Sequence, residues 1–296
     1  MQDLVSVVIP SFNRAATICR AVDSVINQTY KNIEVIIVDD CSTDNTDEVI
    51  RKQYQKQKNV IYEKLKKNSG ACVARNRGID LSRGAYIAFL DSDDAFYPEK
   101  IAKQMALLKE TNYDLCATDY RRIDQYGNEK TIKVIDAQGE ELYKNLLYCN
   151  FITTGTLIGK KECFFDTKFD ESLPRYQDWD LVLRLCQKYQ FCFINEPTII
   201  QEFQKNSITS STSHEKTYNS MRIIYEKNKY GFEKCKKANT QFMWLMGYHS
   251  MFVADKKSYE LLWYGAICYG IKIRRILIVI MFKLGFDSLV EKFFVQ

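Results

Sequence analysis

The sequence of 296 residues predicts an α/β fold, in which a mostly parallel sheet is flanked by helices and followed by a helical C-terminal appendage. The first observation is that apolar runs of strand length recur at residues 4–9, 33–38 and 85–90. The second is that segments of helical spacing separate these runs, with ~20–30 residues to a unit, as in sheets of parallel strands and crossover helices. The third is that a polar cluster follows every run.

The first two strands are each followed by a predicted helix. After residues 4–9, one face of a helix carries Ile18, Val22 and Val25. After residues 33–38, a polar turn leads to Asn45 and Glu48, which have the spacing of a capping box. This spacing predicts a helix through about Tyr54.

The third strand and the later helices show similar signals. Residues 85–90 follow Gly84 and form the third strand. Pro98 with Glu99 indicates the start of the next helix. A further helix, starting near Gln177, is predicted to be buried from its apolar residues Leu181, Leu183, Leu185 and Cys186.

The polar clusters come at the carboxyl ends of the three strands. They are residues 10–14, the pair Asp39 and Asp40, and the turn at residues 91–94 with three aspartates. Ligands of open parallel sheets bind at this edge. Concentrated carboxylates repel one another unless a cation is present, and oxygen ligands suit Mg²⁺ or Mn²⁺. Taken alone, the acidic turn equally fits a solvated turn that caps the next helix.

Composition limits the function classes. A net charge of +5, with positive and negative residues interspersed, does not indicate a nucleic-acid binder. The ten cysteines form no CxxC pair and the chain has two histidines, so zinc spacing is absent. Residues 4–9 enter a strand too early to leave room for a signal peptide. Free thiols without an export signal predict a cytoplasmic protein.

Several segments together resemble, in order and spacing, the opening of family-2 glycosyltransferases with the GT-A fold. The resemblance covers roughly residues 4–185 and rests on residues 6–14, 24–30, 36–44, 70–79, 89–94, 169–172 and 177–181. It implies that the segment after the first strand and the acid after the second bind the nucleotide. Asp40 would accept from a ring N–H of the base; uracil has such a donor, so the implied donor is a UDP-sugar.

The resemblance also assigns individual residues to the donor. Phe12 stands where tyrosine is common and keeps a stacking face, and Arg75 matches an arginine near the diphosphate. Asp93 corresponds to the metal-binding acid, with Asp91 nearer the ribose, which implies a Mn²⁺ or Mg²⁺ cofactor. The full set expected to bind donor and metal is Pro10, Ser11, Phe12, Arg14, Asp39, Asp40, Arg75, Asp91, Ser92 and Asp93.

The catalytic base implied by the resemblance is Asp178. Gln177 replaces the glutamate that precedes this aspartate in the family, which removes a neighbouring charge. Asp178 also suits a helix N-terminus electrostatically, and the two roles are compatible. If Asp178 is not the base, Asp180 is the next residue to consider; Trp179 fits either acceptor contact or core packing.

A histidine that many relatives have after the last sheet strand is not found here. Gln204 stands at that position, so a histidine metal ligand is in doubt. His214, ten residues later, fits either a substitute ligand, if its loop folds over the diphosphate, or an exposed residue at a helix start.

These features together predict an inverting, metal-dependent glycosyltransferase. It would move a hexose or N-acetylhexosamine from a UDP-sugar to a lipid-linked or saccharide acceptor, in bacterial capsule, exopolysaccharide or lipopolysaccharide synthesis. The alternative is a catalytically weak scaffold that binds nucleotide sugars. The catalytic domain is expected at residues 1–212, with the nucleotide-binding half at about 1–100 and the acceptor half at about 101–212, and the helical region at 213–296.

The segment at residues 272–283 is apolar between basic ends. Its uninterrupted apolar run, residues 276–282, is too short for the ~20 residues that span a bilayer. It fits a helix on an anionic membrane face, which would place the protein on the inner face of the cell membrane. A helix buried against the domain fits equally, and association into a homodimer stays open.

Overall fold

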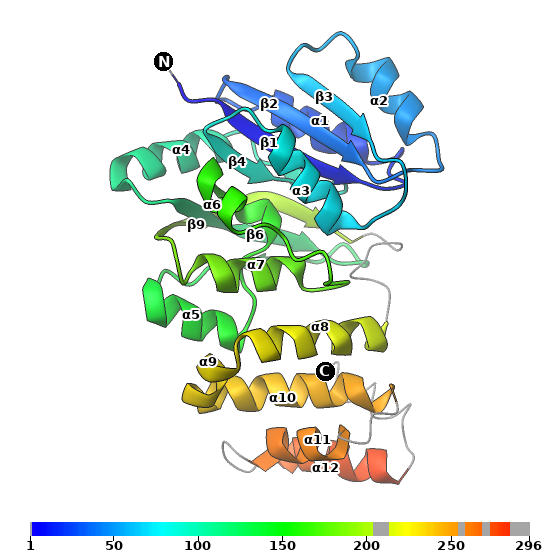
Figure 1. The fold of residues 1–296 in the computed structure, drawn as a ribbon, viewed down its shortest axis with the longest axis vertical. Coiled ribbons are helices and arrows are strands. Elements are labelled where there is room, and N and C mark those ends of the chain that lie inside the picture. The colour runs from blue at the N-terminus through cyan, green and yellow to red at the C-terminus, as the bar shows by residue number, and fades with distance from the viewer. Residues whose placement is uncertain (1, 204–212, 254–257, 268–272, 285–296) are drawn as a thin grey trace. The chain divides into compact units, whose positions relative to one another are not determined.

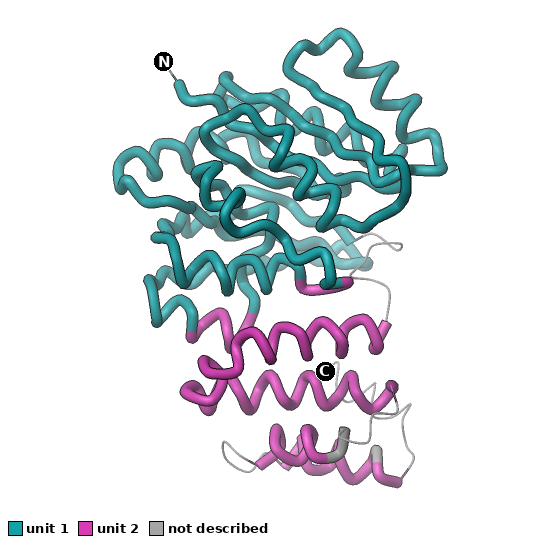
Figure 2. Tube along the Cα trace, viewed as in Figure 1, with its two compact units in different colours: residues 1–143, 150–173, 177–211 teal, residues 144–149, 174–176, 212–296 magenta. Residues whose placement is uncertain are grey.

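The computed structural model describes residues 2–203, 213–253, 258–267 and 273–284. The chain divides into two compact units, shown in teal and magenta in Figure 2. Unit 1 comprises residues 1–143, 150–173 and 177–211, and unit 2 comprises residues 144–149, 174–176 and 212–296. Unit 1 contains the sheet, and the helices α8 to α12 belong to unit 2.

Unit 1 is built around a nine-stranded mixed sheet (Figure 1). Its strand order is β3-β2-β1-β4-β8-β6-β9-β5, with β7 paired to β6. The pairs β1–β2, β2–β3, β1–β4 and β6–β9 are parallel, and the pairs that β4 and β6 make with β8 are antiparallel. The strands are β1 Val5–Ser11, β2 Ile33–Asp39, β3 Val60–Lys64, β4 Tyr86–Phe89, β5 Ala95–Phe96, β6 Leu115–Ile123, β7 Glu129–Ile132, β8 Ile158–Lys160 and β9 Phe191–Glu202.

Helices follow most of the strands. In chain order they are α1 Ile18–Ile26, α2 Thr46–Tyr54, α3 Ala71–Leu81, α4 Lys100–Thr111, α5 Gly139–Tyr148, the 3₁₀ helix η1 Thr154–Thr156, α6 Lys161–Asp166, α7 Gln177–Leu185, α8 His214–Lys227, α9 Lys229–Lys234, α10 Lys236–Met251, α11 Ser258–Ile267 and α12 Ile273–Lys283.

The two faces of the sheet are covered by different helices, because side chains along a strand alternate between faces. Val35 and Ile37 of β2 belong to the main core, which includes the apolar face of α1. Ile36 and Val38, the alternate residues, pack with Ala74 of α3. Both faces of β2 are therefore buried.

Helix α3 lies very close to β1. A Cβ atom on Gly78 would come within 2.2 Å of a Val8 methyl group, so only glycine allows this approach. The close contact brings Arg75, one turn earlier on α3, under the loops that follow the parallel strands. The position of α3 matters because this helix carries a residue of the candidate site.

Unit 2 contains a small helical core of its own. Helices α10 and α11 touch through glycines: a Cβ on Gly265 would lie 2.7 Å from the Trp244 Cα, and one on Gly247 would lie 2.9 Å from the Leu262 backbone N. Around this contact the buried apolar residues are Trp244, Tyr248, Met251, Leu262, Ala266, Ile278 and Val279. No helix in the described residues is long and apolar enough to cross a membrane.

The predicted elements of the N-terminal half are confirmed. The three predicted strands are β1, β2 and β4, and they pair in parallel. Helix α1 buries Ile18, Val22 and Val25, and α4 begins directly after Glu99. Helix α7 begins at Gln177 and is buried as expected.

The predicted capping box at α2 is wrong, although the helix itself runs from Thr46 to Tyr54. Asn45 precedes the helix but its side chain makes no capping hydrogen bond. Asp44 takes that role: its Oδ1 accepts from the Thr46 backbone N at 3.0 Å and from the Thr46 hydroxyl at 2.5 Å. The reason is that Asp44 lies one residue earlier in the turn and reaches the backbone N–H of Thr46, the first residue of the helix.

Candidate active site

The loops after β1 and β2 are joined to each other at the carboxyl edge of the sheet. The Asn13 backbone N donates to Ser42 Oγ at 2.8 Å, and Asn13 Oδ1 accepts from the Thr43 backbone N at 2.8 Å. Asn13 has a φ of 53°, a left-handed conformation that asparagine adopts more readily than most residues. The Arg14 backbone N donates to Thr46 Oγ1 at 2.9 Å. The first two polar clusters therefore form one surface.

The acidic turn after β4 contacts the same surface. Arg14 Nη2 lies 3.4 Å from Asp93 Oδ2, and Arg20 of α1 donates to the Asp93 carbonyl oxygen. The turn is closed by a hydrogen bond from the Asp94 backbone N to the Asp91 carbonyl at 3.0 Å. Burial raises the pKa of the Asp93 carboxyl, the nearby Asp91 charge raises it further, and Arg14 lowers it. The turn thus gathers negative charge and attracts cations.

Asp39 and Asp40 are both buried and both hydrogen-bonded. The two Asp40 carboxylate oxygens accept from the backbone N–H groups of Ser69 and Gly70, each at 2.7 Å. Asp39 Oδ2 accepts from the Tyr62 hydroxyl at 2.7 Å. Asp40 therefore holds the loop in front of α3. A carboxylate oxygen has a further lone pair, so contact between Asp40 and a nucleotide base stays a prediction.

The segment at the end of β1 offers an open aromatic face and an unused hydroxyl. The Phe12 side chain is 40% exposed, which leaves its ring free to stack. The Ser11 hydroxyl is buried and has no hydrogen-bond partner within the described part of the chain. Pro10 lies inside β1 opposite Val38, and Ser92 is buried in the acidic turn. A buried hydroxyl without a partner is costly, so the site has a polar group left for a ligand.

Arg75 connects the acidic turn to helix α7. Its Nη2 donates to Asp91 Oδ1 at 2.7 Å, and its Nη1 donates to Gln177 Oε1 at 2.8 Å. The guanidinium carbon lies 5.3 Å from the centre of the Phe169 ring, and the side chain is buried. Its Nε is buried without a hydrogen-bond partner among the described residues. Arg75 is therefore held in place with one donor still unused.

Asp178 lies in the first turn of α7. Its Oδ1 accepts from the Trp179 backbone N at 2.8 Å, and its carboxylate also bonds the Asn150 side chain. Burial raises the pKa of the Asp178 carboxyl, against the Trp179 N–H and the Arg75 charge, which lower it. A half-buried carboxylate with a raised pKa is the usual state of a general base.

The contacts of Asp180 favour a structural role over that of a substitute base. Its carboxylate is fully buried, and its Oδ2 accepts from Arg184 Nε at 2.9 Å and Nη2 at 2.7 Å. A carboxylate in a buried ion pair cannot reach an acceptor hydroxyl. Trp179 is also buried, which favours core packing of the two roles considered for it.

The residues at the acidic turn fit a hard divalent cation. Among the described residues, no group of three or more histidine, cysteine, aspartate or glutamate side chains forms a complete metal site. An ion held by one or two carboxylates keeps its other positions for water and substrate phosphates, as Mg²⁺ and Mn²⁺ do. Asp93, with a raised pKa and Arg14 as a weak partner at 3.4 Å, has the chemistry of such an anchor.

Of the two expectations made for His214, the structure bears on the helix start, while the substitute metal ligand stays a prediction. His214 begins α8, as expected of a helix-start residue, but its side chain is half-buried rather than exposed. Its Nδ1 lies 3.1 Å from the His249 Nδ1, and its ring stacks on Phe252 with 4.0 Å between centroids. All three residues belong to unit 2. Gln204 lies outside the described residues.

Three residues of this region were not found from the sequence. Arg20 holds the Asp93 carbonyl and also pairs with Glu202 of β9. Gln201, next to Glu202, donates to Asp94 Oδ2 at 3.2 Å. Asn150 bonds the Asp178 carboxylate. These contacts join residues far apart in the sequence, and no local pattern marks them.

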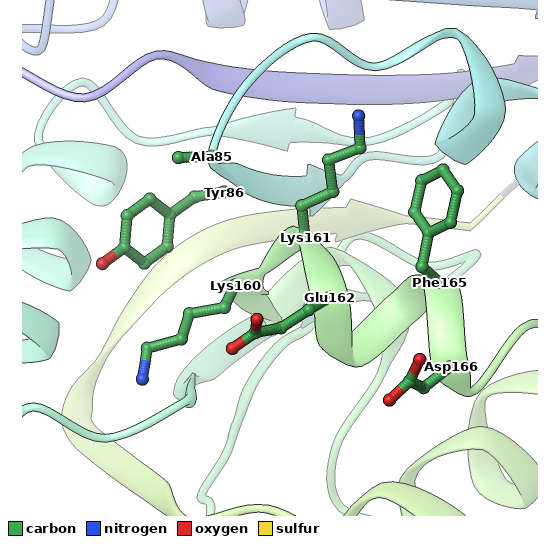
Figure 3. Close-up of a pocket in the computed structure, with 7 residues that line it drawn as sticks. All are labelled: Ala85, Tyr86, Lys160, Lys161, Glu162, Phe165 and Asp166. Atoms are coloured by element: carbon green, nitrogen blue, oxygen red, sulfur yellow. The ribbon is translucent and has the colours of Figure 1, made fainter.

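A surface hollow of about 600 Å³ lies elsewhere on unit 1 (Figure 3). It is lined by Ala85, Tyr86, Lys160, Lys161, Glu162, Phe165 and Asp166. Ala85 and Tyr86 are at the amino end of β4, whereas the acidic turn follows its carboxyl end. The hollow is therefore separate from the region where the polar clusters meet.

Comparison with known proteins identifies the family. The model of the family described as "Glycosyl transferase family 2" matches residues 6–163, more than half of the chain. The chain belongs to this family. In this family-2 glycosyltransferase the matched segment covers the loops after β1, β2 and β4 and extends beyond β8.

Relatives named for polysaccharide biosynthesis are among the similar proteins. The amylovoran biosynthesis glycosyltransferase AmsB of Erwinia amylovora is 34% identical over 65% of this chain and 67% of its own length. The putative teichuronic acid biosynthesis glycosyltransferase TuaG of Bacillus subtilis is 42% identical over 42% of this chain and 52% of its own. An uncharacterised glycosyltransferase of Rickettsia bellii is 38% identical over 59% of this chain, which spans 25% of that relative's length.

Solved structures confirm the predicted GT-A type of fold. S. aureus TarS (1–349) in complex with UDP-GlcNAc has a TM-score of 0.65 at 18% identity, over 99% of this chain and 92% of that one. The mannosyltransferase PcManGT of Pyrobaculum calidifontis, in complex with GDP-Man and Mn²⁺, has a TM-score of 0.61 at 15% identity, over 98% and 87%. At these identities the likeness concerns the fold.

Proposed function

We propose that this family-2 glycosyltransferase transfers a hexose or N-acetylhexosamine from a UDP-sugar, with inversion, to a lipid-linked or saccharide acceptor. The observation that carries the proposal is the Arg75 contact to both Asp91 and Gln177, which joins the donor side of the site to the helix of the predicted base. AmsB is named for amylovoran biosynthesis and TuaG is named as a putative enzyme of teichuronic acid biosynthesis, which supports a role in bacterial surface polysaccharide synthesis.

The donor would bind along the carboxyl edge of the sheet. The exposed ring of Phe12 offers a stacking face for the base, and the Ser11 hydroxyl offers a free polar group. Arg75 and Arg14 bring positive charge toward a diphosphate at the acidic turn. UDP-GlcNAc in the TarS complex and GDP-Man in the PcManGT complex support a nucleotide-sugar donor.

Asp93, with Asp91 beside it, would hold Mn²⁺ or Mg²⁺ together with the diphosphate. When bound, the cation supplies Lewis-acid stabilisation of the charge on the leaving nucleotide. The chain itself contributes the Arg75 charge and the closed turn from Asp91 to Asp94, which keeps the carboxylates in place. Arg75 and Arg14 balance part of the negative charge of the acidic turn.

Asp178 would take the proton from the acceptor hydroxyl as that oxygen attacks the anomeric carbon. The bond from the anomeric carbon to the diphosphate oxygen breaks, and the nucleoside diphosphate leaves with the electron pair. Attack passes through an oxocarbenium-like state, as at other glycosidic centres. A single predicted base supports inversion at that carbon, and within the described residues we identify no carboxylate placed as a nucleophile.

A donor screen tests the proposal. The full chain is incubated with a panel of UDP-, GDP- and dTDP-sugars, with and without Mn²⁺, and release of nucleoside diphosphate is measured together with thermal stabilisation. Turnover of one UDP-hexose or UDP-N-acetylhexosamine that depends on Mn²⁺ or Mg²⁺ is expected. Binding of a UDP-sugar without turnover on any acceptor would instead support a binding scaffold, and turnover of a GDP- or dTDP-sugar would overturn the UDP assignment.

A further inference from the structure

Helix α12 presents an apolar stripe that nothing in the described structure covers. The stripe consists of Ile273, Leu277 and Ile280 of α12 and of Leu284, which follows the helix directly; these residues are 73%, 54%, 43% and 65% exposed. The spacing of four, three and four residues places them on one face of the helix, over a length of ~16 Å at 1.5 Å per residue. We call these four residues the α12 stripe.

The opposite side of the same helix is fully used within unit 2. Ile278 and Val279 are buried in the core with Trp244. Arg275 donates to the Gly265 carbonyl oxygen at 2.7 Å and lies over the Trp244 ring at 4.9 Å from its centre. The helix is therefore anchored through one face, while it is apolar on the other. Large apolar side chains left exposed along one face of a helix are typical of a contact surface, so the α12 stripe indicates a second contact.

Charge indicates what this contact is. At 100° per residue, Arg274 lies on one flank of the α12 stripe and Lys283 lies on the other, and both side chains are exposed. Helix α12 contains no acidic residue. An apolar face with basic residues on both flanks is the pattern of a helix in the interface of an anionic bilayer, where long basic side chains reach the headgroups.

The same charges argue against a second copy of the chain. Pairing two α12 stripes would place basic flanks against basic flanks, which costs free energy. An anionic surface instead gains from each base, and the net charge of +5 acts in the same direction. We infer that the α12 stripe with Arg274 and Lys283 is a surface that docks onto anionic phospholipid bilayers. The inference gives the proposed enzyme a means to reach a lipid-linked acceptor, but it does not depend on the donor or the chemistry.

Vesicle flotation of the full chain tests this inference. Wild-type protein is expected to float with vesicles of phosphatidylcholine and phosphatidylglycerol, and more weakly with phosphatidylcholine alone. Leu277→Glu combined with Ile280→Glu should remove binding to both, because it places charge on the apolar face. Arg274→Gln should weaken binding to the anionic vesicles roughly fivefold, the effect of one charge at such a surface, and leave binding to neutral vesicles unchanged.

The matched control is Tyr230→Glu on α9, at a residue that is 70% exposed in the same unit and lies off the stripe. It should float like wild type. Wild-type flotation by the double variant would overturn the inference. A wild-type dimer that becomes a monomer in the double variant would also overturn it, because the α12 stripe would then join two copies of the chain. Flotation that occurs only after residues 285–296 are deleted would overturn it as well, because those residues would then cover the α12 stripe. Sugar transfer to a soluble acceptor should survive in every variant. Failure of the proposed glycosyltransferase activity can therefore be distinguished from failure of the proposed membrane docking.

Discussion

Asp178→Asn tests the proposed chemistry most directly, because the substitution removes a base with little change in shape. The asparagine keeps a carbonyl oxygen for the Trp179 backbone N, which lies 2.8 Å from the present carboxylate. One altered hydrogen bond changes the free energy of unfolding by about 1 kcal/mol, so the variant should remain folded. Loss of a general base costs ~10²–10⁴-fold in rate, equivalent to about 3–5 kcal/mol in the activation barrier.

The pH dependence makes the prediction sharper. Burial raises the pKa of Asp178, so wild-type turnover should fall as pH decreases through that raised pKa and the base becomes protonated. In Asp178→Asn this acid limb should disappear, while the affinity for UDP, measured by calorimetry, stays near that of wild type. A variant that keeps both the wild-type rate and the acid limb would show that the base is another residue.

Asp180→Asn is the matched control on the same helix. It breaks the ion pair between the buried Asp180 and Arg184, so the free energy of unfolding should decrease by ~3 kcal/mol. Because Asp180 does not reach the acceptor, the remaining folded protein should keep the acid limb. The two variants therefore separate a chemical effect from a structural one, by rate profile and by melting temperature.

Three further predictions follow from other contacts. Asp93→Asn should remove most of the Mn²⁺-dependent gain in UDP-sugar affinity and leave the metal-free affinity unchanged, as calorimetry with and without chelator will show. Gln177→Glu should move the acid limb to higher pH, because a like charge beside Asp178 raises its pKa. Lys100 is fully buried, and burial lowers its pKa to about 7. Between about pH 10.5 and 7 the unfolded chain therefore binds a proton that the folded chain does not, and the free energy of unfolding decreases as the pH decreases. Lys100→Met should remove this pH dependence, as denaturant titrations between about pH 7 and 10.5 will show, while it also removes the hydrogen bond from Lys100 to Gln104 Oε1.

The strands and the first helices could be predicted from the sequence because their signals are local. The apolar runs that became β1, β2 and β4 need only a window of a few residues, and their parallel order follows from the helices between them. The same topology placed the three polar clusters at one edge. The contact of Arg14 with Asp93 confirms that the loops after β1 and β4 meet there.

Other features could not be predicted because long-range packing decides them. The antiparallel insertion of β8 between β4 and β6 has no local signal, since β8 is a short strand, Ile158–Lys160. The choice of Asp44 over Asn45 as the cap of α2 depends on how the turn after β2 packs. The pairing of Arg20 with Glu202 joins residues on α1 and β9. In each case the partner is set by the fold and not by the neighbouring sequence.

The contacts of Gln177 indicate what a neutral side chain does where the resemblance to the family implies a glutamate. Gln177 is not turned toward an open site: its Oε1 accepts from Arg75, and its Nε2 donates to the Leu173 carbonyl at 3.1 Å. A glutamate in the same place would give Arg75 a second carboxylate partner besides Asp91. With a neutral amide there, more of the Arg75 charge remains available to lower the pKa of Asp178 and to attract a diphosphate. The neutral amide therefore keeps α7 in contact with Arg75 without a negative charge beside Asp178.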